Sequence, residues 1–524
     1  MDGNEILRYP VGIQSFEKLR EMGYLYVDKT AVIERLISRP GYYFLSRPRR
    51  FGKSLLLSTL KAYFEGKRDL FSGLAIDRND MPWDSRPVFM LMLNSMAAES
   101  EKDLDSVMEK FLADYESEYG LPTGNPSGLE YPQRFIRLFE HAYKTTGKRV
   151  VLLVDEYDVP LLATLGNPEL NRKYKGVLRA IFNVMKEADS IIEFAMLTGV
   201  SRFSQTSLFS GPNNLNDITM QPDFAAICGI TDEEIHRDLA PGIAEFAKAN
   251  NISEEDAFTR LKENYDGYHF TRNSPDIYNP FSVISALNNK SIGNYWFRSG
   301  TPTFLVKALM RDGFYLPDLD EIEADAMSLS DIESYVQNPV ALLFETGYLT
   351  IKHYDPEYDL YHLGLPNKEV SDSFIKFLLP HYTRIPSRDS DSELRRMKDL
   401  IKAGKAEGFM EYLKGFMAGI PYSNVDFKVK EKYFKNNLYL ILKLLGFNVR
   451  TEVETSFSRM DMVLETDSIV YIFELKLDSS AEKALRQIED REYDAPFGHK
   501  GKRLIRIGVS YSSHTNNIDS WVIR

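Results

Sequence analysis

The segment at residues 46–54, SRPRRFGKS, constrains this chain more than any other. It follows a short apolar run at residues 42–46, and a helical pattern at residues 55–64 comes directly after it. A loop that ends in Gly-Lys-Ser between a strand and a helix is the pattern of a phosphate-binding loop. Backbone N–H groups of such a loop, together with the helix start, surround a phosphate group. The sequence therefore predicts a nucleotide site in the first half of the chain.

Each part of this loop has an expected role. Gly52 allows close approach of the backbone, Lys53 would reach the β- and γ-phosphates of ATP, and Ser54 would bind Mg²⁺. The first glycine of the standard spacing is replaced by Arg47, which we expect to form a basic rim with the two arginines that follow. We predict cofactor contacts along the whole loop and helix start: Arg49, Arg50, Phe51, Gly52, Lys53, Ser54 and Leu55.

Two further strand ends carry polar residues. The apolar run at residues 150–154 ends in Asp155, which would bind the metal, and Glu156, which would polarise the attacking water. The run at residues 191–197 ends at Thr198, where a γ-phosphate sensor would lie, and Arg202 follows with a positive charge for the phosphate. The alternative is that these are ordinary polar residues in solvated loops.

The apolar runs also predict the fold class. Four short, nearly continuous runs, at residues 42–46, 88–93, 150–154 and 191–197, alternate with amphipathic helical patterns. Such runs are typical of parallel strands covered by helices on both faces. We therefore expect an α/β P-loop domain with a parallel sheet.

A second group of chemically suggestive residues lies near the C-terminus. Glu474 and Lys476 are two apart in the apolar run at residues 472–477, so they face the same side of a strand. A neighbouring strand would bring Asp461 beside them, and two carboxylates with a lysine favour a Mg²⁺ site for phosphodiester hydrolysis. We expect Gln487 and Tyr493 to line the same cleft. The alternatives are a solvated strand face and an ordinary helix surface.

Patterning divides the chain into four expected domains. Residues 1–230 form the P-loop domain, and residues 231–385 form a helical region that resembles a winged helix. That region opens with a capping-box spacing at Thr231 and contains a hairpin over residues 347–352 and 358–362. Residues 386–430 form a helical linker, and residues 431–524 a restriction-endonuclease-like α/β domain with the order strand, strand, strand, helix, strand.

Composition excludes some classes of function. The net charge of −12 argues against a broad basic surface for nucleic acid, although it allows a local basic groove. No apolar run approaches the roughly 20 residues that cross a bilayer, and the N-terminus lacks a signal-peptide pattern. We therefore expect a cytoplasmic protein that does not bind membranes. The one cysteine, Cys228, cannot form an internal disulfide.

Short motifs along most of the chain carry a family resemblance. They are YPVGI (residues 9–13), YVDKT (26–30), RPRRFGKS (47–54), VDEYD (154–158), TGVSRF (198–203), NLND (214–217), YDGY (265–268), YNPF (278–281) and YWF (295–297). With these motifs the first half resembles the AAA-ATPase-like family of bacterial proteins. The C-terminal segment resembles the associated PD-(D/E)XK nuclease family.

This resemblance implies roles for particular residues. It implies nucleotide and Mg²⁺ contacts for Lys53, Ser54, Asp155 and Glu156. It implies a nuclease triad with one accessory residue: Asp461, Glu474, Lys476 and Gln487. The family typically has Gly-Arg-x-Asp before the aspartate, and here Ser458 takes the glycine position.

The leading hypothesis is an ATP-hydrolysing protein whose nucleotide state gates a Mg²⁺-dependent nuclease that acts on nucleic acid, with DNA as the favoured partner. One alternative is an ATP-regulated switch whose nuclease-like domain is inactive and only binds a nucleic-acid or protein partner. Another is a P-loop that binds nucleotide without turnover. A homo-oligomer is expected if a neighbouring subunit supplies a catalytic arginine.

Overall fold

The computed structural model describes residues 8–94, 100–125, 128–202, 215–298, 303–311, 314–330, 339–383, 387–419, 427–454, 459–493, 496–497 and 501–524. The chain forms two compact units, one from residues 1–300 and 323–369 and the other from residues 301–322 and 370–524. This division does not follow the boundaries of the four predicted domains, because the predicted region 231–385 contributes to both units. The four domains stay a prediction. Among the described residues, no helix combines the length and the apolar character needed to span a membrane.

The first unit is built on a five-stranded sheet in which all neighbouring strands are parallel. The strand order is β2-β3-β4-β1-β5, with bounds β1 Tyr42–Ser46, β2 Val88–Met92, β3 Val150–Asp155, β4 Ile192–Gly199 and β5 Leu215–Asp217. Every residue of β1 and β3 is buried, as a sheet covered on both faces requires. The predicted α/β class and its four strands are confirmed. The short edge strand β5 was not predicted.

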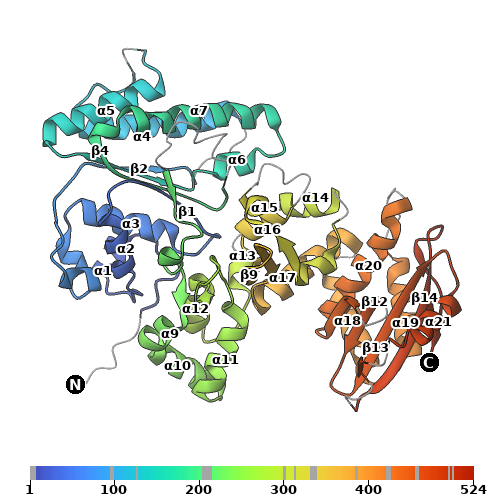
Figure 1. The fold of residues 1–524 in the computed structure, drawn as a ribbon. Coiled ribbons are helices and arrows are strands. Elements are labelled where there is room, and N and C mark those ends of the chain that lie inside the picture. Colours follow the sequence, from blue (N-terminus) through green and yellow to red (C-terminus); the bar gives the residue numbers. More distant parts are fainter. Residues whose placement is uncertain are drawn as a thin grey trace. The chain divides into compact units, whose positions relative to one another are not determined.

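Helices cover both faces of this sheet (Figure 1). One face carries α1 Phe16–Glu21, α2 Thr30–Ile37 and α3 Lys53–Phe64, and the other carries α4 Glu101–Glu118, α5 Tyr131–Thr146 and α7 Pro168–Glu187. The short helix α6 Val159–Ala163 follows β3. Because β1, β3 and β4 are parallel neighbours, the loops that follow them meet at one edge of the sheet.

The rest of the first unit is mainly helical. Its helices are α9 Asp232–Asp238, α10 Ala240–Asn250, α11 Glu254–Tyr265, α12 Pro280–Asn289, α13 Tyr295–Arg298, α15 Ala326–Ser330 and α16 Val340–Glu345. The predicted capping box is confirmed, because the Thr231 hydroxyl accepts the Glu234 N–H and the Glu234 carboxylate accepts the Thr231 N–H. Short strands β6 Ile230–Thr231 and β7 Ile277–Tyr278 pair antiparallel.

The predicted hairpin is also present. Strands β9 Thr350–Asp355 and β10 Leu360–Gly364 pair antiparallel directly after α16, which is the helix-then-wing arrangement expected from the sequence. A third strand, β8 Ile322–Ala324, joins the free side of β10 and was not predicted. Helix α17 Lys368–Thr383 follows the hairpin.

The second unit contains a mixed five-stranded sheet with the order β11-β12-β13-β14-β15. Its strands are β11 Asn448–Glu454, β12 Arg459–Glu465, β13 Ile469–Leu477, β14 Arg503–Ser512 and β15 Asn517–Ile523. Its helices are α14 Thr303–Arg311, α18 Ser387–Lys402, α19 Ala406–Ala418, α20 Phe427–Leu444 and α21 Ala481–Asp490. Only β13 and β14 pair in parallel. The predicted element order is confirmed, with β15 as an unpredicted addition.

Candidate nucleotide site and candidate nuclease site

The loop between β1 and α3 has a backbone suited to a phosphate. Gly52 has a φ of +99° and Arg50 a φ of +68°, so both lie in the left-handed region. A Cβ atom on Gly52 would meet no atom within 4 Å and would project into open space beside the loop. The loop therefore leaves room for a group that contacts its backbone closely, which fits a phosphate.

Lys53 and the acidic end of β3 form a buried set of opposite charges. The Lys53 Nζ donates to the carbonyls of Arg47 and Pro48 at 2.8 and 3.0 Å. Burial lowers the pKa of Lys53, while Glu156 and Asp155 oppose that shift. Burial likewise raises the pKa of Glu156, and the positive charge of Lys53 opposes that rise. Among the described residues nothing donates to the buried Asp155 Oδ2, so this acceptor is available to a cation such as Mg²⁺.

The end of β4 lies against the acidic end of β3. The Thr198 hydroxyl donates to Asp155 Oδ1 at 2.8 Å. Asp158 Oδ2 accepts the backbone N–H groups of Val200 and Ser201 at 3.0 and 2.6 Å. A Cβ atom on Gly199 would lie 2.6 Å from the Tyr157 ring, so only glycine fits there. These contacts hold Thr198 beside Asp155, at the position predicted from the sequence for a γ-phosphate sensor.

A cleft of about 420 Å³ collects most of the predicted nucleotide-site residues. Those that line it are Arg49, Arg50, Gly52, Lys53, Ser54, Leu55 and Glu156. The Phe51 side chain is elsewhere, buried against the rings of Tyr268 and Phe270. It anchors the loop from behind, so any phosphate contact at this position would come from the backbone.

The cleft also has walls that sequence reasoning missed. They are Pro10, Gly12, Ile13, Gln14, Asn94, Val159, Pro280, Phe281 and Ile284. Asn94 follows β2 at the same sheet edge as Asp155. A polar residue directly after an apolar strand is a pattern from which Asn94 could have been predicted as a site residue. Pro280 and Phe281 belong to the YNPF motif, to which the sequence assigned no role. A mostly apolar pocket adjoins the cleft and shares five lining residues with it: Pro10, Gly52, Leu55, Pro280 and Ile284.

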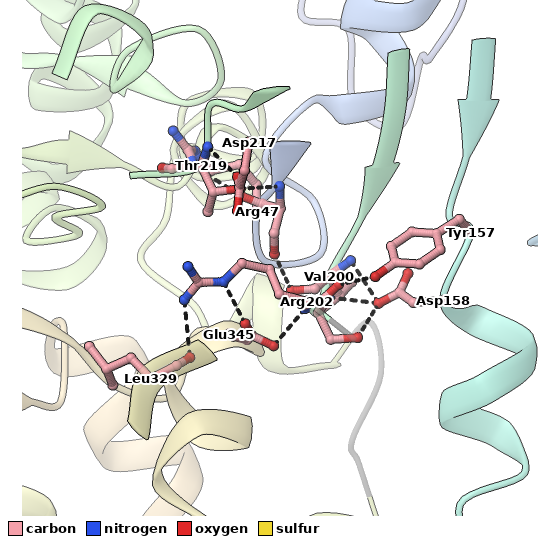
Figure 2. A network of polar contacts seen from close by, with 11 residues as sticks. Arg47, Tyr157, Asp158, Val200, Arg202, Asp217, Thr219, Leu329 and Glu345 are labelled. Atoms are coloured by element: carbon pink, nitrogen blue, oxygen red, sulfur yellow. Dashed lines mark hydrogen bonds and ion pairs between the residues drawn. The ribbon is translucent and has the colours of Figure 1, made fainter. Parts of the chain in front are cut away.

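Two arginines near the loop are engaged elsewhere (Figure 2). Arg47 is 1% exposed, and its guanidinium donates to the carbonyls of Ser46 and Thr219, both at 2.8 Å. The expectation that Arg47 belongs to the basic rim is therefore wrong, because this side chain turns inward to satisfy backbone carbonyls. Arg202 lies at the end of β4, and its Nε donates to Glu345 Oε1 at 2.8 Å while its Nη2 donates to the Leu329 carbonyl at 3.0 Å.

The second unit brings the three predicted nuclease residues together. Met462 pairs with Phe473, so the next step of this antiparallel register sets Asp461 opposite Glu474. Lys476 Nζ contacts Glu474 Oε1 at 2.9 Å, and Asp461 Oδ2 accepts the Leu475 N–H at 2.8 Å. Glu474 is only 2% exposed. Burial, with Asp461 contributing, raises the pKa of Glu474 to about 7.

The donor set fits a hard cation. Among the described residues nothing donates to the buried Glu474 Oε2, which lies beside a second carboxylate. No cluster of three or more His, Cys, Asp or Glu side chains arranged for a metal is found in the described part of the chain. A Mg²⁺ ion here would therefore use two carboxylates and keep several waters, as Mg²⁺ commonly does.

Gln487 is connected to this site through Tyr493. The Gln487 amide donates to the Tyr493 hydroxyl at 3.1 Å, and that hydroxyl donates to the Arg459 carbonyl at 2.7 Å, two residues before Asp461. Ser458, the position where the family typically has glycine, lies outside the described residues.

Sequence reasoning missed Lys435 and Glu452. Lys435 Nζ lies 2.8 Å from Asp461 Oδ1 and 3.3 Å from Glu452 Oε1. Lys435 belongs to α20 and Glu452 to β11, so only the tertiary fold brings them to the site. We find no local sequence signal that would have identified them.

Comparisons with known proteins identify the families that two parts of the chain match. A family model described as "Predicted AAA-ATPase" matches residues 10–209, and the model of the PD-(D/E)XK nuclease superfamily matches residues 429–521. A protein from Azotobacter chroococcum mcd 1, "Uncharacterized protein in vnfD 5'region", is 35% identical over 526 residues and 98% of each chain is covered. The ORC2 protein of Aeropyrum pernix, solved in ADPNP-ADP complexes, is 14% identical with a TM-score of 0.18, covering 70% of this chain and 92% of that chain. That score is too low to bear on the fold. The chain belongs to the family of predicted AAA-ATPases that carry a C-terminal domain of the PD-(D/E)XK nuclease superfamily.

Proposed function

We propose that this protein binds and hydrolyses ATP, and that its nucleotide state controls a Mg²⁺-dependent nuclease activity of its C-terminal domain. The observation that carries the proposal is the presence, in one chain, of two buried carboxylates with an unsatisfied oxygen beside a lysine. These are Asp155 near Lys53 and Glu474 near Lys476. A buried carboxylate oxygen without a donor is costly in a folded protein unless a cation binds it.

At the nucleotide site, each residue of the cleft would have a separate role. Lys53 would exchange the loop carbonyls for phosphate oxygens, and Ser54 and Asp155 would hold Mg²⁺. Glu156 would orient the attacking water, and Thr198 would sense the γ-phosphate through the contact it makes beside Asp155. Pro280, Phe281 and Ile284, which also line the cleft, would cover the base.

At the nuclease site, Asp461 and Glu474 would hold Mg²⁺ and Lys476 would orient a water molecule. The water would release a proton as its oxygen bonds to phosphorus, the bond from phosphorus to the sugar oxygen would break, and the sugar oxygen would take up a proton from solvent. Gln487 would support the site through Tyr493. The proposed substrate is DNA.

The source of a catalytic arginine at the nucleotide site and the cellular location of the protein are also proposed. Arg49 and Arg50 already line the cleft, whereas Arg202 would contribute charge to the γ-phosphate only by leaving Glu345, so a further catalytic arginine would come from a second copy of the chain. We propose a homo-oligomer for that reason, and a cytoplasmic location.

The proposal is tested by cleavage of supercoiled plasmid and of single-stranded DNA and RNA, with Mg²⁺, with and without ATP. We expect Lys476→Ala to abolish cutting and Lys53→Ala to abolish the effect of ATP. Lys61→Ala is the matched control, because Lys61 is a half-exposed residue of the same helix α3, paired with Glu65 at 3.6 Å. Cutting that persists unchanged in Lys476→Ala would count against the nuclease site.

A second candidate function is a switch whose C-terminal domain binds nucleic acid without cutting it. The observation that favours it is the Lys435 ammonium group on Asp461, which occupies a carboxylate needed for the metal. This function predicts DNA binding that responds to ATP, with no cleavage under any metal condition. Glu156→Gln, which should trap bound ATP, would then lock the DNA-binding state.

A further inference from the structure

Lys435 lies among the carboxylates of the candidate nuclease site. Its ammonium group contacts Asp461 Oδ1 at 2.8 Å, Glu452 Oε1 at 3.3 Å and Glu431 Oε1 at 3.3 Å, and its side chain is only 12% exposed. Three carboxylates around one ammonium group keep it charged. The fold therefore places the positive charge of Lys435 directly beside Asp461, one of the proposed metal ligands.

Asp461 has no free oxygen in this arrangement. Its Oδ2 accepts the Leu475 N–H at 2.8 Å, and its Oδ1 carries the Lys435 ammonium group. A divalent cation bound by Asp461 and Glu474 would meet a like charge on the same carboxylate. The repulsion is strong at such a short separation in a partly buried site, so metal binding and the Lys435–Asp461 contact oppose each other.

Glu452 provides Lys435 with a second anchor. Glu452 is itself held in place, because Tyr315 donates to its Oε1 at 3.2 Å and Arg459 contacts its Oε2 at 3.0 Å. The lysine stem is flexible, so its ammonium group can leave Asp461 and remain beside Glu452. A displaced ammonium group at the edge of a metal site is suited to a phosphate oxygen.

We infer that Lys435 is a metal-responsive cation of the nuclease site, which neutralises Asp461 when no divalent metal is bound and binds a non-bridging phosphate oxygen of the nucleic acid when metal is present. The inference rests on the proposed function, because it requires Asp461 and Glu474 to bind a divalent cation. It makes Lys435 a positioning residue for the nucleic acid and a competitor of the metal.

The test measures Mn²⁺ binding to the full-length protein without nucleotide, by electron paramagnetic resonance, at low ionic strength. We expect Lys435→Met to bind Mn²⁺ about tenfold more tightly than wild type, because a like charge is removed. Lys435→Arg keeps the charge and should bind Mn²⁺ as wild type does. Lys432→Met is the matched control, since Lys432 is an exposed lysine of the same helix. Asp461→Asn identifies the signal of this site.

A second readout is DNA binding in Ca²⁺ or Mn²⁺. We expect Lys435→Met to weaken binding of a duplex and to reduce by about one the slope of log affinity against log salt, since one phosphate contact is lost. Lys432→Met should leave that slope unchanged. Tighter Mn²⁺ binding together with weaker DNA binding is the combination that a purely structural lysine would not produce.

The outcomes separate this inference from the proposed function. If Asp461→Asn binds Mn²⁺ as wild type does, the site holds no metal and the proposed nuclease activity fails. If Asp461→Asn loses the signal while Lys435→Met binds Mn²⁺ no more tightly than wild type, the inference about Lys435 is overturned and the metal site stands. Lys435→Gln is a second charge-removing variant for use if Lys435→Met does not fold.

Discussion

Several carboxyl groups of this protein are buried, and Asp266 illustrates the consequence. It is 3% exposed, and nothing among the described residues donates to its Oδ1. Burial, with Asp276 contributing, raises its pKa to about 7, while Lys262 and the Gly267 N–H oppose the shift. The neighbouring Gly267 has a φ of +91°, and a Cβ atom there would lie 2.4 Å from the Pro366 carbonyl oxygen. The backbone therefore holds Asp266 in its buried position.

This raised pKa predicts a pH-dependent stability. The folded protein binds the Asp266 proton more tightly than the unfolded chain, so the stabilising contribution is full below about pH 4 and is lost as the pH rises through 7. Asp266→Asn should remove this loss. We expect the stability of the variant relative to wild type to rise by roughly 1–3 kcal/mol between pH 5 and pH 8, with most of the rise below pH 7. Thermal unfolding at several pH values checks this, and an offset that does not change with pH would contradict it.

At the scale of elements, the Arg202–Glu345 pair joins the end of β4 to α16 (Figure 2). Glu345 is buried, accepts the Arg202 backbone N–H at 2.8 Å, and has its pKa raised to about 7 by burial, against the effect of Arg202. The strand that carries Thr198 is thereby connected to the helix that precedes the hairpin β9–β10. A nucleotide that moves Arg202 would disturb that helix.

Breaking this buried pair should be costly. We expect Glu345→Ala to lower the free energy of unfolding by about 3–5 kcal/mol, because it leaves a buried guanidinium unpaired. The double variant Arg202→Met with Glu345→Leu should recover most of the loss. Urea unfolding followed by tryptophan fluorescence provides the measurement. Glu140→Ala, which breaks the exposed Glu140–Lys144 pair of α5, is the control and should change stability by less than about 0.5 kcal/mol.

At the scale of the whole molecule, the two units hold two different sites. The candidate nucleotide site belongs to the first unit, and the candidate nuclease site belongs to the second. Gating of one by the other is a coupling free energy, and such coupling is reciprocal. The gating proposal therefore makes a claim about ATP affinity as well as about cutting.

We expect DNA to change the affinity for a non-hydrolysable ATP analogue by the same factor as the analogue changes the affinity for DNA. A coupling factor on the order of 5–150 is typical of allosteric proteins. The measurement uses Lys476→Ala, so that the DNA stays intact, and fluorescence titrations in both directions. A factor of one in both titrations would mean that the two sites work independently, and the gating proposal would fail.

Local patterns were sufficient for a large part of this protein. Four strands of the first sheet, the loop that presents Lys53, the capping box at Thr231 and the pairing of β12 with β13 all depend on residues close in sequence or on simple alternation. Strand β5 is too short to show alternation, and the sequence of β15, NIDSWVI, does not alternate cleanly, so neither was predicted.

The sequence by itself located the two candidate sites, because a strand followed by Gly-Lys-Ser, and a Glu and a Lys two apart on a half-apolar strand, are local features. Only the tertiary structure decided which other residues reach them. It turned Arg47 inward onto carbonyls, gave Arg202 a partner in Glu345, closed the nucleotide cleft with Pro280 and set Lys435 against Asp461. Each of these contacts joins side chains from distant elements, and their energies depend on burial and charge that no single segment contains.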